Sequence, residues 1–249
     1  MKILIINPNT TETFTEAVQV AVDAYKSSDT EIIAVNPKAG PGTIESIFEE
    51  MMSGAPTLEL FLANENKYDG FIIACYGNEG LVQAAREITD KPVIGITEAS
   101  YYMACMLGRK FSVVTTGDRW ESLLWDSVRL HGLEDRCASM RPTSIATSEL
   151  EASGDDIVRE HLLKESRKAL EEDGADVILL GCAGMTGFDK ELEAELGVPV
   201  IDGVVAALKF MEALIGYGVG TSKRKAYQPL EPVELHNLPP IFNEAYKGN

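Results

Sequence analysis

The chain lacks the features that mark several special classes of protein. No apolar stretch approaches the roughly 20 residues that cross a bilayer. The apolar run after Lys2 is too short for a secretory signal and leads to no small-residue cleavage site. Only four cysteines occur in 249 residues, which is too few for a disulfide framework. We therefore expect a cytoplasmic globular protein with free thiols and no membrane partner.

Positive charge and metal-binding patterns are also scarce. Lys and Arg number 22 against 39 Asp and Glu, a net charge of −17, and a field of that sign repels phosphate backbones and anionic lipids. The three histidines are isolated, no HExxH or CxxC pattern occurs, and no GxGxxG follows an expected strand. The sequence thus predicts no nucleic-acid partner, no metal and no dinucleotide cofactor.

The hydrophobic content of 45% suffices for a buried core, and short β-branched runs alternate with longer amphipathic stretches. Buried strands are expected at Lys2–Ile6, Glu31–Val35, Gly70–Ala74, Pro92–Ile96, Lys110–Thr115, Val177–Leu180 and Pro199–Ile201. Helices are expected at Glu12–Tyr25, Ser46–Asn64, Leu81–Ile88, Glu98–Leu107, Arg119–His131 and Asp155–Asp173. This alternation predicts an α/β fold with parallel sheets and a site at the C-terminal ends of the strands.

An internal repeat divides the chain. Seven residues recur 107 positions later as the same residue types: Asp69, Cys75, Gly77, Gly80, Pro92, Val93 and Ile94 become Asp176, Cys182, Gly184, Gly187, Pro199, Val200 and Ile201. Duplication of one α/β unit explains this offset better than a solenoid, whose repeats span about 20–50 residues. We expect two similar lobes that face each other across a cleft. Residues 1–98 form the first, completed by a helix and an extended, proline-containing arm in 205–249, and residues 99–204 form the second.

Cys75 and Cys182 occupy equivalent positions in this repeat. Each follows a buried strand and precedes a glycine-containing turn before a helix, where N–H groups favour negative charge and lower the pKa of a thiol from about 8.5. Ordinary burial is the better interpretation of a single cysteine at a strand end. It is kept for Cys105 and Cys137, which have no repeat partner. Two cysteines at equivalent turns instead favour a reactive pair.

One thiol from each lobe suits an enzyme that inverts a carbon centre without a cofactor. Such a racemase removes a proton from one face of the carbon and returns one to the other, so two acid/base groups of similar pKa on opposite faces meet its requirement. The carbanion must then be held as an enolate. Backbone N–H groups of Tyr76–Gly77 and Ala183–Gly184 are candidate donors to the enolate oxygen.

Several motifs of the chain resemble those of the hydantoin racemase family, which includes allantoin racemases and lies in the Asp/Glu racemase superfamily. The matching segments are Ile6–Thr10, Gly42–Ser46, Ala74–Gly77, Pro92–Ala99, Phe111–Thr116, Gly181–Met185, Pro199–Val204 and Thr221–Arg224. The resemblance implies two pseudo-symmetric lobes, each with a four-stranded parallel sheet flanked by helices, and an active site between them. It also implies cofactor-independent chemistry, a homo-oligomer, and catalytic roles for Cys75 and Cys182. One departure follows the first cysteine, where the family's usual Asp-Pro pair is Asn78-Glu79.

Further residues are candidates for binding a small-molecule substrate. Asn7, Asn9 and Thr10 follow the first strand, where their polar groups are placed to bind a ring carbonyl or N–H. Helix capping by Thr10 or Thr11 is a second interpretation of the same loop. Ile44 fits an apolar wall over the substrate and simple core packing equally well. The predicted substrate-binding residues are Pro8, Asn9, Ile44, Tyr76, Gly77, Thr115, Thr116, Ala183 and Gly184.

The leading hypothesis is an isomerase that racemises 5-monosubstituted hydantoins or allantoin through the two thiols. Two alternatives stay open. The first is another reaction of the same superfamily, such as amino-acid racemisation or a maleate isomerase-like reaction. The second is a non-catalytic small-molecule binding protein on the same scaffold, since a fold alone does not specify an activity.

Overall fold

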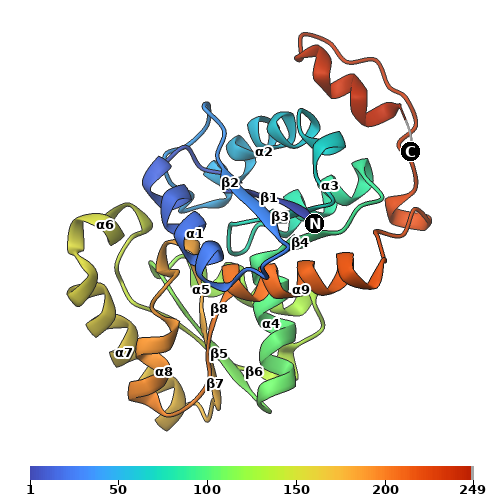
Figure 1. The fold of residues 1–249 in the computed structure, drawn as a ribbon. Helices are drawn as coiled ribbons and strands as arrows, with labels where there is room; N and C mark the ends of the chain where they lie inside the picture. The colour runs from blue at the N-terminus through green and yellow to red at the C-terminus, as the bar shows by residue number, and fades with distance from the viewer. Residues whose placement is uncertain (248–249) are drawn as a thin grey trace.

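The computed structural model describes residues 1–247 and contains, within them, eight parallel strands in two sheets (Figure 1). The first sheet is built from β1 (Lys2–Ile6), β2 (Glu31–Val35), β3 (Gly70–Ile73) and β4 (Val93–Gly95). The second is built from β5 (Phe111–Thr115), β6 (Cys137–Pro142), β7 (Val177–Leu180) and β8 (Val200–Asp202). Their spatial orders, β2-β1-β3-β4 and β6-β5-β7-β8, are one arrangement used twice. The expected pair of four-stranded α/β lobes is confirmed.

The sequence patterns did not predict β6. This strand forms the edge of the second sheet, where its neighbour is β5, and only Cys137 and Met140 of its six residues are buried. The other four residues of β6 are only partly buried, so its sequence lacks the continuous apolar run that marks the fully buried strands. Cys137 is therefore the first residue of a strand, and its side chain packs in the core.

Helices connect the strands and cover the sheets (Figure 1). They are α1 (Glu12–Tyr25), α2 (Ile47–Leu62), α3 (Glu79–Ile88), α4 (Ile96–Leu107), α5 (Trp120–Leu130), α6 (Leu150–Ser153), α7 (Asp155–Glu171), α8 (Asp189–Leu196) and α9 (Gly203–Tyr217). Each helix expected by residue range is present, with ends within two residues of those predicted. The short helices α6 and α8 were not predicted, because four to eight residues show too little of the 3.6-residue period.

Helices α4 and α9 join the two lobes. α4 follows β4 of the first sheet and packs on β7 and β8 of the second, while α9 follows β8 and packs on β3 and β4 of the first. The starts of the two helices meet so closely that a Cβ at Gly203 would lie 2.9 Å from the Ile96 carbonyl oxygen. Only glycine fits there. One hydrophobic core therefore includes residues of both sheets; the boundary of the lobes near residue 98 stays a prediction.

The repeated residues make the same hydrogen bonds in both lobes. The Asp69 carboxylate accepts from the Lys2 N–H at 2.7 Å, and the Asp176 carboxylate accepts from the Arg109 and Lys110 N–H groups at 2.9 Å. Likewise, the Pro92 carbonyl oxygen accepts a hydrogen bond from the Phe71 N–H of β3 at 3.0 Å. The Pro199 carbonyl oxygen accepts one from the Ile178 N–H of β7, also at 3.0 Å. These residues recur in the sequence because each fixes the start of a strand in its own sheet.

The C-terminal tail runs back over the first lobe. Lys223 Nζ donates to the carbonyl oxygens of Arg86 and Glu87 in the last turn of α3, where unpaired carbonyls favour a cation. Residues 229–239 form neither helix nor strand, in agreement with the expected extended arm. A 3₁₀ helix, Pro240–Tyr246, then lies against α2 (Figure 1) and packs Ile241 and Phe242 on the first-lobe core.

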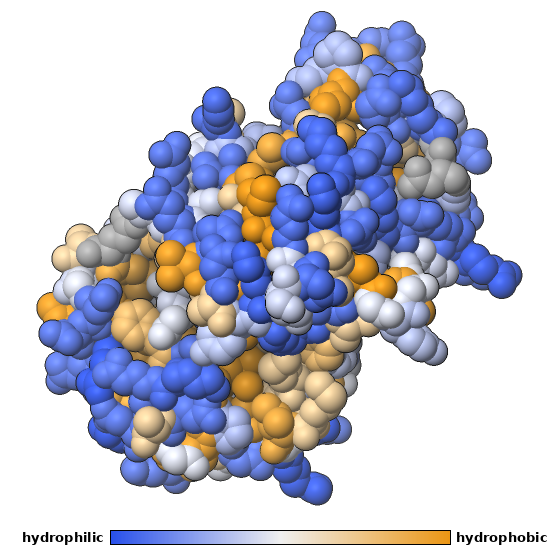
Figure 2. All heavy atoms as spheres, viewed as in Figure 1, coloured by the Kyte–Doolittle hydropathy of each residue, from blue (hydrophilic) through white to orange (hydrophobic). Residues whose placement is uncertain are grey.

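Hydrophilic residues make up most of the face shown in Figure 2, with hydrophobic residues in small groups between them. Among the described residues, exposed apolar side chains include Phe48 and Met51 on α2 and Tyr217 at the end of α9. Within the same residues, no helix combines the length and the apolar character that crossing a membrane requires.

Candidate active site

Cys75 and Cys182 line one cavity between the lobes. β3 ends at Ile73 and β7 at Leu180, so each cysteine is the second residue after a central strand of its sheet. The cavity encloses about 30 Å³, room for about one or two water molecules. Its other lining residues are Asn7, Asn9, Phe14, Val18, Ile44, Ala74, Tyr76, Thr116, Trp120, Thr147, Gly181, Ala183 and Gly184.

Most of the predicted site residues meet in this inner cavity, namely Asn9, Ile44, Cys75, Tyr76, Thr116, Cys182, Ala183 and Gly184. Pro8, Gly77 and Thr115 do not line it. Pro8 is buried, the Thr115 hydroxyl donates to the Gly181 carbonyl at 3.0 Å, and the Gly77 N–H donates to Thr97 Oγ1 at 2.8 Å. The Gly77 N–H is thus already partnered, so the expectation that it serves an enolate is wrong.

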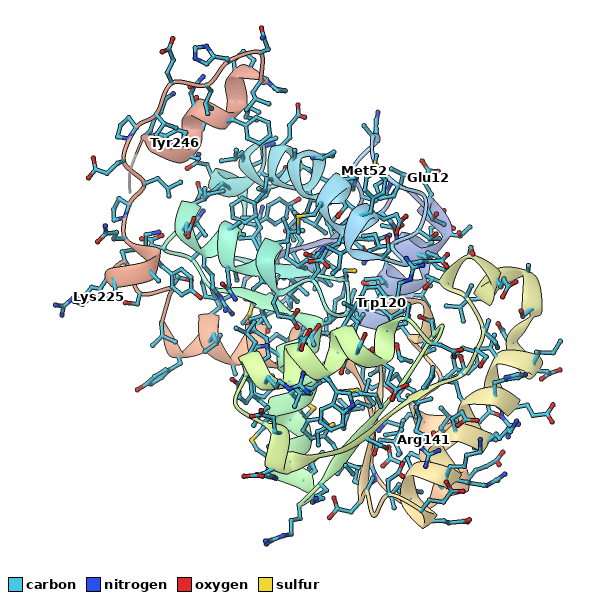
Figure 3. The ribbon with its side chains drawn as sticks, turned by 180° about the vertical axis from the view of Figure 1, so that it is seen from behind. Glu12, Met52, Trp120, Arg141, Lys225 and Tyr246 are labelled. Carbon is cyan, nitrogen blue, oxygen red and sulfur yellow. The ribbon has the colours of Figure 1, made fainter. Side chains whose placement is uncertain are left out.

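Asn7, a further candidate of the first loop, also lines the cavity, and six residues line it without having been predicted: Phe14, Val18, Ala74, Trp120, Thr147 and Gly181. Phe14 and Val18 lie four residues apart on one face of α1, and their helical period indicates core packing. Trp120 begins α5 shortly after β5, and Figure 3 shows it in the middle of the molecule between the two lobes. Its place after a strand was the available signal, because loops at the C-terminal ends of parallel strands converge.

Amide side chains organise the loop after β1. Asn7 Nδ2 donates to Asn9 Oδ1 at 2.9 Å, and Asn9 Oδ1 also accepts from the Thr11 N–H at 2.9 Å. Thr11 is the N-cap residue of α1, but its hydroxyl donates to the Gly42 carbonyl and caps no helix N–H. The predicted side-chain capping by Thr10 or Thr11 is therefore wrong. Both of these hydrogen bonds use the Asn9 oxygen, and the Asn9 side chain lines the inner cavity.

Both thiols are harder to ionise than a free cysteine. Burial raises the pKa of Cys75 well above its usual range, and the negative charges of Cys182, Glu50 and Glu79 raise it further. Burial also raises the pKa of Cys182 to about 11, although a backbone N–H of its turn and the Thr147 hydroxyl act in the opposite direction. The expectation that the turns lower the thiol pKa is wrong, because desolvation of the thiolate outweighs the donors around it.

A wider outer cavity of about 390 Å³ adjoins the inner one and shares Thr116, Trp120 and Thr147 with it. Glu45 lines this cavity, and its Oε1 accepts from the Ser148 N–H at 3.1 Å. Because Glu45 belongs to the first lobe and Ser148 to the second, this hydrogen bond bridges the lobes beside the site. The charged residues of the outer lining are Glu45, Glu49, Asp118 and Arg119.

The inner cavity differs from the outer one in charge. None of the described residues that line it is Asp, Glu, Lys, Arg or His, and both cysteines are in the thiol form at neutral pH. Across residues 1–247, no three His, Cys, Asp or Glu side chains converge as the ligands of a metal ion. The arrangement offers two neutral acid/base groups, one from each sheet, in a site built from neutral donors and apolar walls.

Comparison with known proteins identifies the family. Residues 3–211 match the family model described as Asp/Glu/Hydantoin racemase. The chain is 46% identical over 235 residues to hydantoin racemase of Pseudomonas sp. (strain NS671), covering 94% of each chain. It is 39% identical over 240 residues to hydantoin racemase of Paenarthrobacter aurescens, covering 96% of this chain and 100% of that one.

A solved structure agrees with these relatives. Allantoin racemase from Klebsiella pneumoniae superposes with a TM-score of 0.91 at 39% identity, and the match covers 95% of this chain and 96% of that one. Relatives named as racemases over nearly the full length support an isomerase of the racemase type. The chain therefore belongs to the Asp/Glu/hydantoin racemase family.

Proposed function

We propose that this enzyme inverts the stereocentre of a 5-monosubstituted hydantoin or of allantoin by proton transfer between Cys75 and Cys182. The observation that carries the proposal is one cavity lined by a thiol from each of two equivalent turns. Racemisation needs an acid on one face of a carbon and a base on the other. The substrates named for the relatives, hydantoin and allantoin, support the substrate class.

In this mechanism the two sulfurs exchange roles in every turnover. A thiolate on one side takes the proton from C5 of the ring, and the thiol on the other side gives its proton to the opposite face. Because the pKa of each thiol is raised, each holds its proton until the carbanion forms and each thiolate is a strong base. The carbanion is stabilised as the enolate of the neighbouring ring carbonyl, whose oxygen needs hydrogen-bond donors.

A neutral ring suits the inner cavity better than an amino acid or a dicarboxylate does. Carboxylates bind to Arg or Lys, and the described lining of this cavity contains neither. Burial of an unpaired carboxylate costs several kcal/mol. The Asn9 amide and the hydroxyls of Thr116 and Thr147 supply neutral donors and acceptors for the ring carbonyls, the ring N–H and the enolate oxygen.

Substrate entry requires the inner cavity to widen, because its 30 Å³ holds about one or two water molecules and a five-membered ring is larger. We expect the loop that carries Ile44 and Glu45 to move. The hydrogen bond from the Ser148 N–H to Glu45 holds this loop against the second lobe, and breaking it would let the loop move away from the cavity. The substituent on C5 then extends into the outer cavity, whose 390 Å³ accommodates groups of different size.

The test is a substrate panel in D2O. Single enantiomers of 5-methylhydantoin, 5-benzylhydantoin, allantoin and aspartate are incubated with the chain, and maleate is added as a fifth compound. We expect loss of optical purity, with deuterium entering the stereocentre, for a hydantoin or allantoin and for neither aspartate nor maleate.

Two variants then test the mechanism. Cys75→Ala and Cys182→Ala are each expected to lose racemisation by at least about 1,000-fold, while Cys105→Ala, a partly buried cysteine outside both cavities, retains it. Full activity in both site variants would overturn the two-thiol mechanism. Turnover of aspartate or maleate alone would overturn the substrate class, and tight ligand binding without turnover would leave a binding protein.

A further inference from the structure

Cys75 lines a second cavity as well as the inner one. This chamber encloses about 20 Å³, and Cys75 is the one described residue that it shares with the inner cavity. Cys182 has no counterpart to it among the described cavities. The polar residues of its lining that matter here are Asn78, Glu79, Arg86, Glu98 and His131. The first two are the residues that depart from the usual Asp-Pro pair of the family.

Two buried polar atoms of the chamber residues lack a protein partner. Asn78 Nδ2 and His131 Nε2 have no nitrogen or oxygen partner among the described residues, and the Asn78 side chain lies within hydrogen-bonding reach of the Cys75 sulfur. The other ring nitrogen of His131, Nδ1, lies 3.4 Å from Tyr102 Oη, so Nε2 is the atom left over. A cavity of this size holds one water molecule. Such a water accepts from Asn78 Nδ2 and exchanges a proton with His131 Nε2, whose role as donor or acceptor follows the protonation of the ring.

A carboxylate lies beside the unpartnered nitrogen of the His131 ring. Glu79 Oε1 lies 3.9 Å from His131 Nε2 and accepts a hydrogen bond from the Ser127 hydroxyl. The Glu79 carboxylate therefore faces the ring atom through which a proton enters or leaves His131. Arg86 and Glu98 form an ion pair with each other, so Glu79 is the charged residue of the chamber lining that lies beside the ring.

A two-thiol racemase has to restore its protonation between turnovers. When Cys182 acts as the base, the turnover ends with Cys182 as the thiol and Cys75 as the thiolate. A second molecule of the same enantiomer needs Cys182 as the thiolate and Cys75 as the thiol, so it cannot react until both protonation states are reversed. We propose that the chamber is a proton relay that resets Cys75 from solvent, with Asn78 positioning the water, His131 passing the proton and Glu79 lying beside the nitrogen through which that proton passes. This inference rests on the two-thiol racemisation proposed above.

The reset balances in protons and charge. The Nε2–H bond of the His131 imidazolium breaks and gives its proton to the water, and the water gives a proton to the Cys75 sulfur, where the S–H bond forms. The neutral imidazole, whose side chain is 12% exposed, takes a proton from solvent. Cys182 loses its proton to solvent on the other side. The net change is one proton moved from Cys182 to Cys75.

Variants of the relay residues are expected to lower the rate of net racemisation more than the rate of label exchange between enantiomers. A structural defect would lower both rates together. Net racemisation of one pure enantiomer at saturation requires a reset after each turnover. Exchange of a carbon-13 label between enantiomers in a racemic mixture does not, because the two enantiomers use the two protonation states in turn. The substrate is the hydantoin or allantoin that the panel shows to turn over fastest, and chiral chromatography with mass detection follows both rates.

Glu79→Gln and His131→Asn are expected to lower the ratio of net racemisation at saturation to label exchange at least about tenfold. The matched controls are Glu65→Gln, a buried carboxylate that accepts from the Thr89 hydroxyl, and His236→Asn, an exposed histidine. Neither control changes the ratio of the two rates. Glu79→Gln keeps an acceptor for the Ser127 hydroxyl, so it tests the relay even where His131→Asn fails to fold.

The outcomes separate this inference from the function on which it rests. A wild-type chain that racemises no substrate of the panel overturns both. A wild-type chain that racemises, with relay variants that lose both rates in parallel or lose neither, overturns the relay alone.

Discussion

The turns after β3 and β7 begin alike and then diverge. Each starts with a cysteine followed two residues later by glycine, and both thiols line the same cavity. α3 begins at Glu79, the fourth residue after Cys75, whereas α8 begins at Asp189, the seventh after Cys182, with a 3₁₀ turn between. The first turn passes directly into a helix that starts with a carboxylate; the second extends its backbone around the sulfur.

This difference changes the surroundings of each thiol. In the first turn, Gly77 has a φ of 86° and its N–H donates to Thr97. In the second, a backbone N–H and the Thr147 hydroxyl stabilise the Cys182 thiolate. Cys75 has one such donor, the Asn78 side chain, and lies near the Glu50 and Glu79 carboxylates, which oppose its ionisation. We therefore expect Cys182 to ionise before Cys75. Equivalent sequence positions give unequal acids, because the neighbours of each thiol differ.

The largest expected effect assigns one thiol to each enantiomer. Cys75→Ala leaves Cys182 as the base and should exchange the C5 proton of one enantiomer with D2O, although racemisation falls at least about 1,000-fold. Cys182→Ala should exchange the other enantiomer, more slowly at neutral pH because the pKa of Cys75 is raised by burial and by nearby negative charges. Proton NMR on separate enantiomers measures the exchange. If both variants exchanged the proton of the same enantiomer, the assignment of one thiol to each enantiomer would be wrong.

The pH dependence of kcat/KM tests the raised pKa values. Because the pKa of Cys182 lies at about 11 and that of Cys75 is also raised, the thiolate is a minor form at neutral pH. Its fraction rises about tenfold for each pH unit below the pKa. We expect kcat/KM for 5-methylhydantoin to rise about tenfold per unit from roughly pH 6 to pH 8, after subtraction of the uncatalysed rate. A plateau already below pH 7 would contradict the raised pKa values, since no thiol with a raised pKa produces one.

Alanine at the two equivalent glycines should separate backbone strain from crowding. The backbone at Gly77 has a φ of 86°, which is unfavourable for alanine, and a Cβ there would lie 3.0 Å from the Trp120 ring. At Gly184, a Cβ would lie 2.7 Å from the end of the flexible Leu150 side chain. We expect Gly77→Ala to lower the free energy of unfolding by about 2 kcal/mol and Gly184→Ala by less than about 1 kcal/mol. Urea unfolding measures both.

Gly80→Ala is the control for this pair, because a Cβ there meets nothing within 4 Å. It should leave the free energy of unfolding unchanged or slightly higher. Equal losses for Gly77→Ala and Gly184→Ala would mean that the two turns do not differ in backbone conformation.

The smallest expected effect concerns the charge near Cys182. Glu45 raises the pKa of Cys182 and accepts from the Ser148 N–H. Glu45→Gln removes the charge but keeps an acceptor, so we expect about a twofold rise in kcat/KM at neutral pH. Glu45→Ala also removes the bridge between the lobes, and KM should change severalfold. Glu12→Gln, on the exposed start of α1, is the control. An equal rise in kcat/KM there would mean that the effect of Glu45→Gln comes from the net charge of the protein and not from the position of Glu45.

Much of the fold could be predicted because its signals are local. β1, β2 and β7 have the predicted bounds, and β3, β4, β5 and β8 differ from theirs by one residue at one or both ends. Buried parallel strands carry continuous apolar runs, which distinguish them from amphipathic helices. β6 was missed because its half-exposed residues carry no such run, and α8 was missed because eight residues rich in acidic side chains show little helical period.

The site could be predicted only in part. The repeat brought Cys75, Cys182 and the residues beside them to attention, since duplication marks equivalent positions. Trp120 and Thr147 could not be found in this way, because they have no repeat partner and reach the cavity only when the second lobe folds against the first. His131 was interpreted as an isolated histidine, since its neighbour Glu79 lies far away in the sequence.

The sequence by itself determined the class of fold, the duplication and the identity of the two thiols. Each of these depends on residue type and spacing, which the chain carries before it folds. Only the tertiary structure decided how readily each thiol ionises, and it reversed the expected direction. The pKa of a buried group depends on the water it loses and the charges that approach it. For Cys75 these are Glu50 from α2 and Glu79 from α3, and for Cys182 the hydroxyl of Thr147, neighbours that packing alone brings together.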